Sequence, residues 1–487
     1  MEFVLDPALR DASAAVAAVR ASFTVVDDGQ RKLQRRWYDT FDWRLHRAGL
    51  VLEQVGTQLT LTRDDGEQLV QLAHALGGPT FADALPAGPL RDQLAPILGI
   101  RALLPVAETT GVATDLRVLN ADEKTVVRLT HDESFLTVQP VRGYRAQADK
   151  VTKALDNVEG VAPLRGSRLA AVLNGSDRQP GGYTGKVSIQ LDRDDSATHA
   201  VTTILLDLLD TAEANVEGTV EDWDTEFLHD LRIAVRRTRT ALKLCGDALP
   251  DGLAARYATQ FKWLGDITTP TRDLDVYVLG FDAFGGSPDL EPFRAFLEHQ
   301  RGIAQRKLAR SLRSVRFGRL LRTWRDKLAA VEDTGELTAG QLAAARIKHA
   351  HRRAVKRGSA ITADSPAESL HDLRKRCKEL RYLLEFFASL HDPAIHRGLI
   401  KDLKGLQDCL GEFQDNEVQA HAIRTFAAEM MTAGNAAPET ILAMGELTGR
   451  LDQGQHHARE EFAGRFARFA SAENTDRVKA LLTGSTK

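Results

Sequence analysis

The amino-acid sequence contains one motif twice, and this repeat constrains the fold more than any other feature. Residues 228–232 and 370–374 both read Leu-His-Asp-Leu-Arg, so that His229 and His371 are separated by 142 positions. The same offset aligns further pairs over about fifty residues without a gap: Arg236 with Lys378, Arg239 with Arg381, Lys262 with Lys404, and Asp273 with Asp415. A constant offset over this length is typical of a tandem duplication. We therefore predict two related subdomains.

Hydrophobic periodicity divides the chain into two regions. The repeat region has apolar residues spaced at about 3.6 and few β-branched clusters, which indicates helices. Earlier residues instead form short β-rich stretches between turn-forming residues. Strands are expected at Gln58–Thr62 and Thr125–Leu129, and short helices at Ala12–Ala21 and Gln147–Leu155. Helix breaks are expected near Leu249–Gly252, Gly285–Pro288, Ser365–Pro366 and Gly434–Pro438.

These patterns predict a multidomain protein with an α+β part and an all-α part. The expected divisions are an α+β domain dominated by antiparallel strands at 1–173, a linker at 174–195, and an all-α domain at 196–487 with repeats at about 196–340 and 341–487. The cysteine content and the hydrophobicity of the chain indicate where in the cell the protein is expected. Three cysteines, without a CxxC pair, favour a reducing environment. No apolar run reaches the roughly 18 residues of a membrane helix, and we expect a cytoplasmic protein with no membrane contact.

One helix face in each repeat carries only cations. In repeat 1 the residues follow a spacing of three or four, and repeat 2 has the same spacing: His229, Arg232, Arg236, Arg239 and Lys243, then His371, Arg374, Lys378 and Arg381. An apolar face runs beside each basic face. No acid is interleaved, and like charges at this spacing cost a few tenths of a kcal/mol per pair. At about 1.5 Å per residue the first face is roughly 20 Å long, which suits a linear polyanion better than a compact nucleotide.

The formal net charge is only −3, so any affinity for anions must be local. Two further cationic clusters lie between Arg301 and Lys327, where Asp326 is the only acid, and between Arg346 and Arg357, which has none. Two interpretations are open. The cations could be solvated or paired with acids on neighbouring helices, of which the candidates are Asp273, Asp275, Asp415 and Glu417. Alternatively, they bind an external polyanion, which the duplication of the basic face favours.

The repeated motif, with Trp263-Leu264-Gly265 leading into Arg272–Val276, resembles the CHAD domain, the conserved histidine α-helical domain, over about residues 196–480. The resemblance implies two four-helix bundles related by pseudo-twofold symmetry, basic residues lining a shared groove, and binding of inorganic polyphosphate at polyphosphate granules. Eight positions match the family's basic motif: His229, Arg232, Arg236, Arg239, His371, Arg374, Lys378 and Arg381. The repeat offset adds Lys262 and Lys404. Arg237 counts less, because Glu379 occupies the equivalent position.

The remaining predicted polyphosphate-binding residues come from the basic faces and the cationic clusters. They are Lys243, Arg306, Arg310, Arg313, Arg352, Arg353, Lys356, Lys375 and Lys401.

Residues 37–52 resemble the strand-turn-strand signature of the CYTH, or triphosphate tunnel, family, and Ser167–Ala170 resembles its closing segment. The resemblance implies an antiparallel β-barrel whose lumen holds triphosphate between basic side chains and a metal bound by carboxylates. The family's opening Glu-x-Glu-x-Lys strand is replaced by Glu2, Val4 and Asp6. Other departures are Glu53 and Val55 for arginines, Thr62 for a lysine, and Thr137-Val138-Gln139 for Glu-x-Glu. Because a hard divalent cation needs oxygen ligands, we predict a degenerate scaffold without catalytic activity.

Other chemistries have no visible set of residues. His229 and His371 lack a His, Cys or carboxylate at i+4, whereas transition-metal sites need three or four ligands. No phosphate-binding glycine loop, nucleophile elbow or dinucleotide fingerprint is present. We therefore expect no metal, no cofactor and no catalytic residue.

The leading hypothesis is non-enzymatic binding of inorganic polyphosphate. RNA or single-stranded DNA is an alternative ligand, because it is also a linear polyanion. Single-strand binders stack bases on aromatic rings, but aromatic residues make up only 6% of this chain. A divergent metal-dependent triphosphate hydrolase is the enzymatic alternative, and the missing carboxylates weigh against it.

Overall fold

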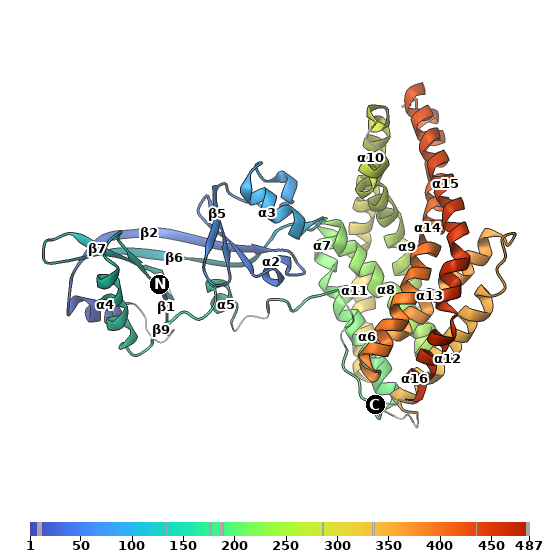
Figure 1. Cartoon of the computed structure of the whole chain (residues 1–487), viewed down its shortest axis with the longest axis horizontal. Helices are drawn as coiled ribbons and strands as arrows, with labels where there is room; N and C mark the ends of the chain where they lie inside the picture. Colours follow the sequence, from blue (N-terminus) through green and yellow to red (C-terminus); the bar gives the residue numbers. More distant parts are fainter. Residues whose placement is uncertain are drawn as a thin grey trace. The chain divides into compact units, whose positions relative to one another are not determined.

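The computed structural model describes residues 1–6, 12–132, 134–174, 178–185, 187, 189–284, 287–333, 335, 337–434 and 436–483. The chain forms two compact units, Met1–Gly185 and Lys186–Lys487. The first is built mainly from strands and the second from helices (Figure 1). The division falls within the segment predicted as a linker, of which residues 175–177, 186 and 188 lie outside the described residues. No helix in the described part of the chain is long and apolar enough to span a membrane.

The first unit contains a nine-stranded sheet in which all neighbouring strands are antiparallel, in the order β5-β4-β3-β2-β6-β7-β8-β1-β9. The strands are β1 (Glu2–Leu5), β2 (Thr24–Asp39), β3 (Leu50–Val55), β4 (Gln58–Arg63), β5 (Gln68–Ala73), β6 (Leu104–Leu119), β7 (Thr125–Asp132), β8 (Phe135–Pro140) and β9 (Val161–Pro163). The long strands β2 and β6 pair along their whole length and form the centre of the sheet (Figure 1).

The sheet is open, so the predicted closed barrel is wrong. Its edges are β5 and β9, and these two strands do not pair with each other in the described residues. Closure requires two edges that offer matching runs of backbone hydrogen-bonding groups. Here β9 has only three residues, and helix α3 (Pro89–Leu98) lies against β5 at the other edge (Figure 1).

Short helices complete the first unit: α1 (Ser13–Arg20), α2 (Arg44–Arg47), α4 (Arg145–Asp156) and α5 (Arg168–Leu173), with a 3₁₀ turn at Ala82–Ala84. Helices α1 and α4 pack together, and Val19 and Val151 from them join Phe3 and Leu129 of the sheet in one core. The helices expected at Ala12–Ala21 and Gln147–Leu155 are confirmed as α1 and α4. The strands expected at Gln58–Thr62 and Thr125–Leu129 are confirmed as β4 and β7.

The second unit consists of helices. They are α6 (Ala197–Ala214), α7 (Val216–Val220), α8 (Thr225–Cys245), α9 (Leu253–Leu279), α10 (Glu291–Leu312), α11 (Val315–Ala329), α12 (Ala339–Gly358), α13 (Ala367–Phe386), α14 (Pro393–Thr432), α15 (Pro438–Phe469) and α16 (Ala472–Thr483). Helices α6, α8, α9 and α10 of repeat 1 correspond in order to α12, α13, α14 and α15 of repeat 2, and α11 and α16 follow. Three of the expected helix breaks precede the first residues of α9, α13 and α15.

A pseudo-twofold axis relates the two repeats. Ser196 and Thr338, which cap α6 and α12, are separated by the repeat offset and form an antiparallel bridge with each other. The Ala197 N–H donates to the Leu337 carbonyl at 2.8 Å, and the Ala339 N–H donates to the Asp195 carbonyl at 2.7 Å. Reciprocal contacts of this kind are expected where two equivalent elements meet on a twofold axis.

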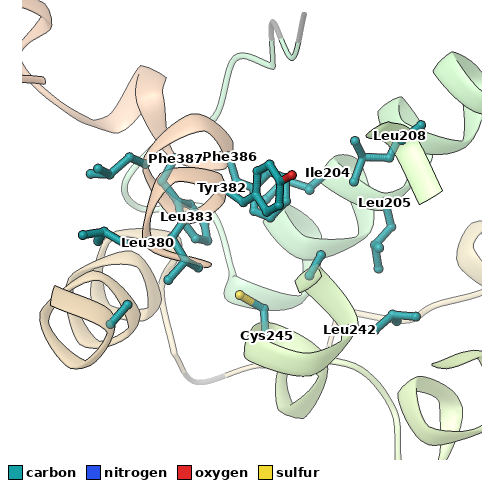
Figure 2. Packing of buried hydrophobic residues seen from close by; sticks show 14 of the residues in the cluster. Ile204, Leu205, Leu208, Leu242, Cys245, Leu380, Tyr382, Leu383, Phe386 and Phe387 are labelled. Carbon is teal, nitrogen blue, oxygen red and sulfur yellow. The ribbon is translucent and has the colours of Figure 1, made fainter. Parts of the chain in front are cut away.

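One hydrophobic core runs through both repeats. The predicted apolar faces of α8 and α13 are buried in it, for example Leu231 and Leu373, which have no exposed surface. Figure 2 shows Leu242 and Cys245 of α8, Leu380 and Leu383 of α13, and Ile204 of α6 around the same interior. Because each apolar face is fixed inward, the neighbouring basic face of each helix is held at a defined orientation.

Candidate functional site

The basic faces of α8 and α13 meet α9 and α14 near the pseudo-twofold axis. Five cations are close enough there to affect one another electrostatically, and we call them the central cation cluster: Arg232, Arg236, Arg272, Arg374 and Lys378. Four of them were predicted site residues. Arg272 on α9 was missed, because Gln414 is its equivalent in repeat 2 and the repeat comparison therefore hides it.

The electrostatics of the central cation cluster are unfavourable in the free protein. Burial, together with Arg374 and Arg236, lowers the pKa of Lys378 to about 8 from its ordinary 10.5. Burial, Arg236 and Arg272 also lower the pKa of Arg232, against the opposing effect of Asp273. Lys378 and Arg236 are equivalent residues of the two repeats, so part of the repulsion on Lys378 comes from the basic face of the other repeat.

Two arginines of the cluster are held by neighbouring helices. Arg232 Nη1 donates to Thr268 Oγ1 and Thr269 Oγ1 on α9, both at 2.9 Å. Arg374 Nη1 donates to Gln414 Oε1 on α14 at 2.9 Å, and its Nη2 lies 3.1 Å from Asp415 Oδ1. These contacts fix the guanidinium groups and leave part of their donor capacity unused.

Several donors at the site have no protein partner. Within the described ranges, the exposed side chains of Arg236 and Arg239 and the half-buried side chain of Lys378 make no hydrogen bond or ion pair. Arg272 Nη1 and Arg374 Nε are buried atoms without a hydrogen-bond acceptor. The guanidinium group of Arg239 lies close to Gly265 of α9. A Cβ atom added at Gly265 would be only 3.0 Å from Arg239 Nη1. Unsatisfied buried donors are costly, so this arrangement favours an external anion.

Other predicted site residues are paired with acids, and for them the expectation of faces without protein counterparts is wrong. The ion pairs are Lys243–Glu379 at 2.6 Å, Lys262–Asp266 at 2.9 Å, Arg313–Glu221 at 2.6 Å, Lys375–Asp372 at 3.5 Å and Arg381–Glu385 at 2.7 Å. In addition, His371 Nε2 lies 2.8 Å from Glu417 Oε2. These acids lie on another helix or on a different face of the same helix. The spacing of residues along the basic face therefore does not predict them. The alternative interpretation is thus correct for Asp415 and Glu417, and also for Asp275, which lies 2.8 Å from Arg301 of the Arg301–Lys327 cluster.

The remaining predicted residues lie elsewhere on the helical unit. Arg306 and Arg310 are exposed on α10, Arg352, Arg353 and Lys356 on α12, and Lys401 and Lys404 on α14. No ion pair or hydrogen bond between described residues joins them to the central cation cluster. His229 is half-buried on α8 at the position equivalent to His371.

The first unit contains a cavity of about 710 Å³, lined by Glu2, Arg35, Glu53, Thr62, Thr137, Gln139 and Arg168 among others. Two of its arginines are paired with acids in or beside the cavity. Arg35 lies 2.7 Å from both Glu53 and Asp132, and Arg168 lies 2.9 Å from both Asp132 and Glu2. The charges of these five residues therefore largely compensate each other. In the residues that the structure describes, no group of three or more His, Cys, Asp or Glu side chains could hold a metal ion.

A comparison with protein families finds a match within the helical unit. Residues 203–424 match the model of the CHAD domain, and this segment includes both copies of the histidine motif. The match to the CYTH family stays a prediction. No curated protein matched the chain.

Two solved structures resemble part of the chain. The crystal structure of the CHAD domain from the plant Ricinus communis is 24% identical, with an alignment that covers 61% of this chain and 96% of that one at a TM-score of 0.48. PptA from Streptomyces chartreusis is 16% identical, with coverage of 56% and 99% and a TM-score of 0.44.

Proposed function

We propose that this protein binds inorganic polyphosphate without catalysing a reaction, and that the central cation cluster is the centre of the binding site. The observation that carries the proposal is the group of unpaired cations and buried orphan donors at Arg236, Arg272, Arg374 and Lys378. A bound phosphate chain would accept hydrogen bonds from these groups and relieve their mutual repulsion. Counterions released from the ligand would add a salt-dependent contribution, by analogy with nucleic-acid binding.

The surroundings of the cluster favour a ligand made only of phosphate. Two aromatic rings lie near the cluster, Phe413 beside the predicted site residue His371 and Tyr382 beside the neighbouring Arg237, and they are 2% and 8% exposed. Rings buried in this way offer no surface on which a base could stack. Phosphate contacts without base contacts give affinity without sequence information, which supports polyphosphate over RNA.

The proposal assigns no phosphate hydrolysis to the sheet unit. Glu2, Glu53 and Asp132 are each bonded to Arg35 or Arg168, so the acids of the cavity have partners already and the arginines are not free to hold a triphosphate. We extend the proposal to the cytoplasm and its polyphosphate granules, where the ligand would be most concentrated.

The test is a binding titration with the full chain and long-chain polyphosphate. We expect Arg236→Gln and Lys378→Met each to weaken binding by at least about tenfold, because a hydrogen bond to a charged group contributes about 1.5–3 kcal/mol. Each variant should also reduce the slope of log affinity against log salt by about one. Arg145→Gln, which alters an exposed arginine of α4 in the sheet unit, is the matched control and should bind like the wild type.

Circular dichroism melting of each variant separates a lost contact from a lost fold. The site assignment is wrong if the folded double variant Arg236→Gln/Lys378→Met retains wild-type affinity. An RNA oligonucleotide that displaces polyphosphate at equal phosphate concentration and fixed salt would instead support the nucleic-acid alternative.

A further inference from the structure

Two ion pairs join α8 of repeat 1 to α13 of repeat 2. Arg237 Nη2 lies 2.8 Å from Glu385 Oε2, and the two side chains are 12% and 19% exposed. Lys243 Nζ lies 2.6 Å from Glu379 Oε1, where the acid is 13% exposed and the lysine 59%. Together these four residues tie the two basic helices to each other beside the central cation cluster.

The two pairs are equivalent under the pseudo-twofold axis. The repeat offset carries Arg237 onto Glu379 and Lys243 onto Glu385. One rotation therefore exchanges the Arg237–Glu385 pair with the Lys243–Glu379 pair, and it reverses the charge at every position. Repeat 1 supplies both cations and repeat 2 supplies both acids. The sequence repeat has an acid, Glu379, at the position equivalent to Arg237. This exception is explained by the reversal of charge, because Glu379 pairs with Lys243.

Glu379 is held in its ionised form. Burial opposes ionisation of Glu379, but hydrogen bonds from Lys243 and Arg376 lower its pKa below the ordinary value. Arg376 Nη1 lies 2.8 Å from Glu379 Oε2, and Arg381 Nε lies 2.7 Å from Glu385 Oε1. An ion pair that is mostly removed from water is costly to break, because one charge is then left buried and unpaired.

The apolar core contains both matched and unmatched pairs of equivalent residues. Leu228 and Leu370, Leu231 and Leu373, and Leu242 and Leu384 are all leucine and all buried. Other buried pairs differ in size, namely Ala241 and Leu383, and Cys245 and Phe387. The backbone bridge between Ser196 and Thr338 is indifferent to side-chain identity. Apolar packing therefore distinguishes the repeats by size, and the four charged residues distinguish them by the sign of their charge.

We propose that Arg237, Lys243, Glu379 and Glu385 form a charge code that pairs the two unlike repeats of one chain and prevents like repeats of two chains from pairing. Repeat 1 against a second repeat 1 would place Arg237 against Lys243 twice. Repeat 2 against a second repeat 2 would place Glu379 against Glu385 twice. Both arrangements bring like charges together at a partly desolvated interface, whereas the unlike arrangement forms two ion pairs.

Three variants of the full chain test the code. The all-acidic variant is Arg237→Glu/Lys243→Glu, the all-basic variant is Glu379→Lys/Glu385→Lys, and the charge-swap variant carries all four substitutions. We expect each double variant to lower the urea midpoint of the helical unit by about 1 M. The charge-swap variant rebuilds both pairs in reverse and should recover most of that loss. Arg424→Glu, in an exposed pair within repeat 2, is the matched control and should change the midpoint little.

Native mass spectrometry then measures whether repeats of two different chains pair. After co-refolding from urea, an equimolar mixture of the all-acidic and all-basic chains should give a one-to-one heterodimer, whereas the wild type and the charge-swap variant should stay monomeric at the same concentration. The code is refuted if the charge-swap variant is as unstable as the double variants, or if the mixture gives only monomers. Neither the urea midpoint nor the mass measurement depends on polyphosphate binding. The proposed function could therefore be wrong while the pairing code is correct, and the pairing code could be wrong while the proposed function is correct.

Discussion

Lys378 offers the sharpest test of the proposed site, because its charge depends on whether an anion is bound. The lysine is half-buried beside Arg374 and Arg236, and its pKa in the free protein is lowered to about 8 from 10.5. A polyanion that binds the cluster favours the charged ammonium and returns the pKa towards its ordinary value. Binding above pH 8 therefore requires proton uptake by Lys378.

The size of the effect follows from these two pKa values. If binding restores the full shift, affinity at pH 9 should be about tenfold lower than at pH 7, a loss of about 1.4 kcal/mol. Isothermal titration calorimetry at constant ionic strength from pH 7 to 9.5 measures this decrease. Repeating the titration at pH 9 in buffers of different ionisation enthalpy counts the protons taken up, and about one is expected for each site occupied.

Lys378→Arg provides the control, because an arginine stays charged across this range. Subtracting its pH profile removes the titration of polyphosphate end groups and of other residues. Identical pH dependence for the wild type and Lys378→Arg would refute the reasoning, since it would mean that Lys378 does not gain a proton on binding.

The same pKa shift has the opposite sign for stability. Because the folded pKa lies below the unfolded one, the unfolded chain binds more protons between pH 8 and 10.5, and the free energy of unfolding rises with pH across that window. The cost of the charged form at pH 7 is at most about 3 kcal/mol. Lys378→Met should therefore raise the melting temperature of the helical unit while it weakens polyphosphate binding.

Two further predictions concern packing. Asp132→Ala removes an acid that pairs with both Arg35 and Arg168 in the sheet unit, and it should lower the free energy of unfolding by about 3 kcal/mol. The loss should be visible as faster amide hydrogen exchange in β1, β7 and β8. Unchanged exchange would show that Glu2 and Glu53 are sufficient partners for the two arginines. Gly358→Ala places a Cβ against the Phe466 ring and should lower the free energy of unfolding by about 1–3 kcal/mol, measured by urea unfolding. The control Gly318→Ala, which has open space around it, should not destabilise the protein. Equal urea midpoints for the two variants would mean that the Phe466 ring moves aside without cost.

Much of the fold could be read from local patterns. The periodicity of the apolar residues identified α8 and α13, and both apolar faces are buried as expected. Turn-forming residues marked the ends of helices, for example at Ser365–Pro366 before α13. The closed barrel could not be checked in this way, because closure depends on the length of β9 and on α3 at the opposite edge. Those are relations between distant segments.

The candidate site was predictable only in part. Spacing placed Arg232, Arg236 and Arg374 on basic faces, but it gave no information about the acids that other helices bring to those faces. Asp415 lies near Arg374, and Glu385 near Arg237, only after the helices pack. Arg272 escaped notice because it has no basic equivalent in repeat 2.

The sequence alone determined the duplication, the helical character of the repeat region and the two basic faces, because each depends on residue spacing along one chain segment. The tertiary structure decided which cations remain unpaired. Charge neutralisation acts through space, and the partners of Lys243 and Arg237 lie more than 130 residues away along the chain. The packing of α8 against α13 therefore leaves Arg236 and Lys378 open to an external anion while it pairs their neighbours.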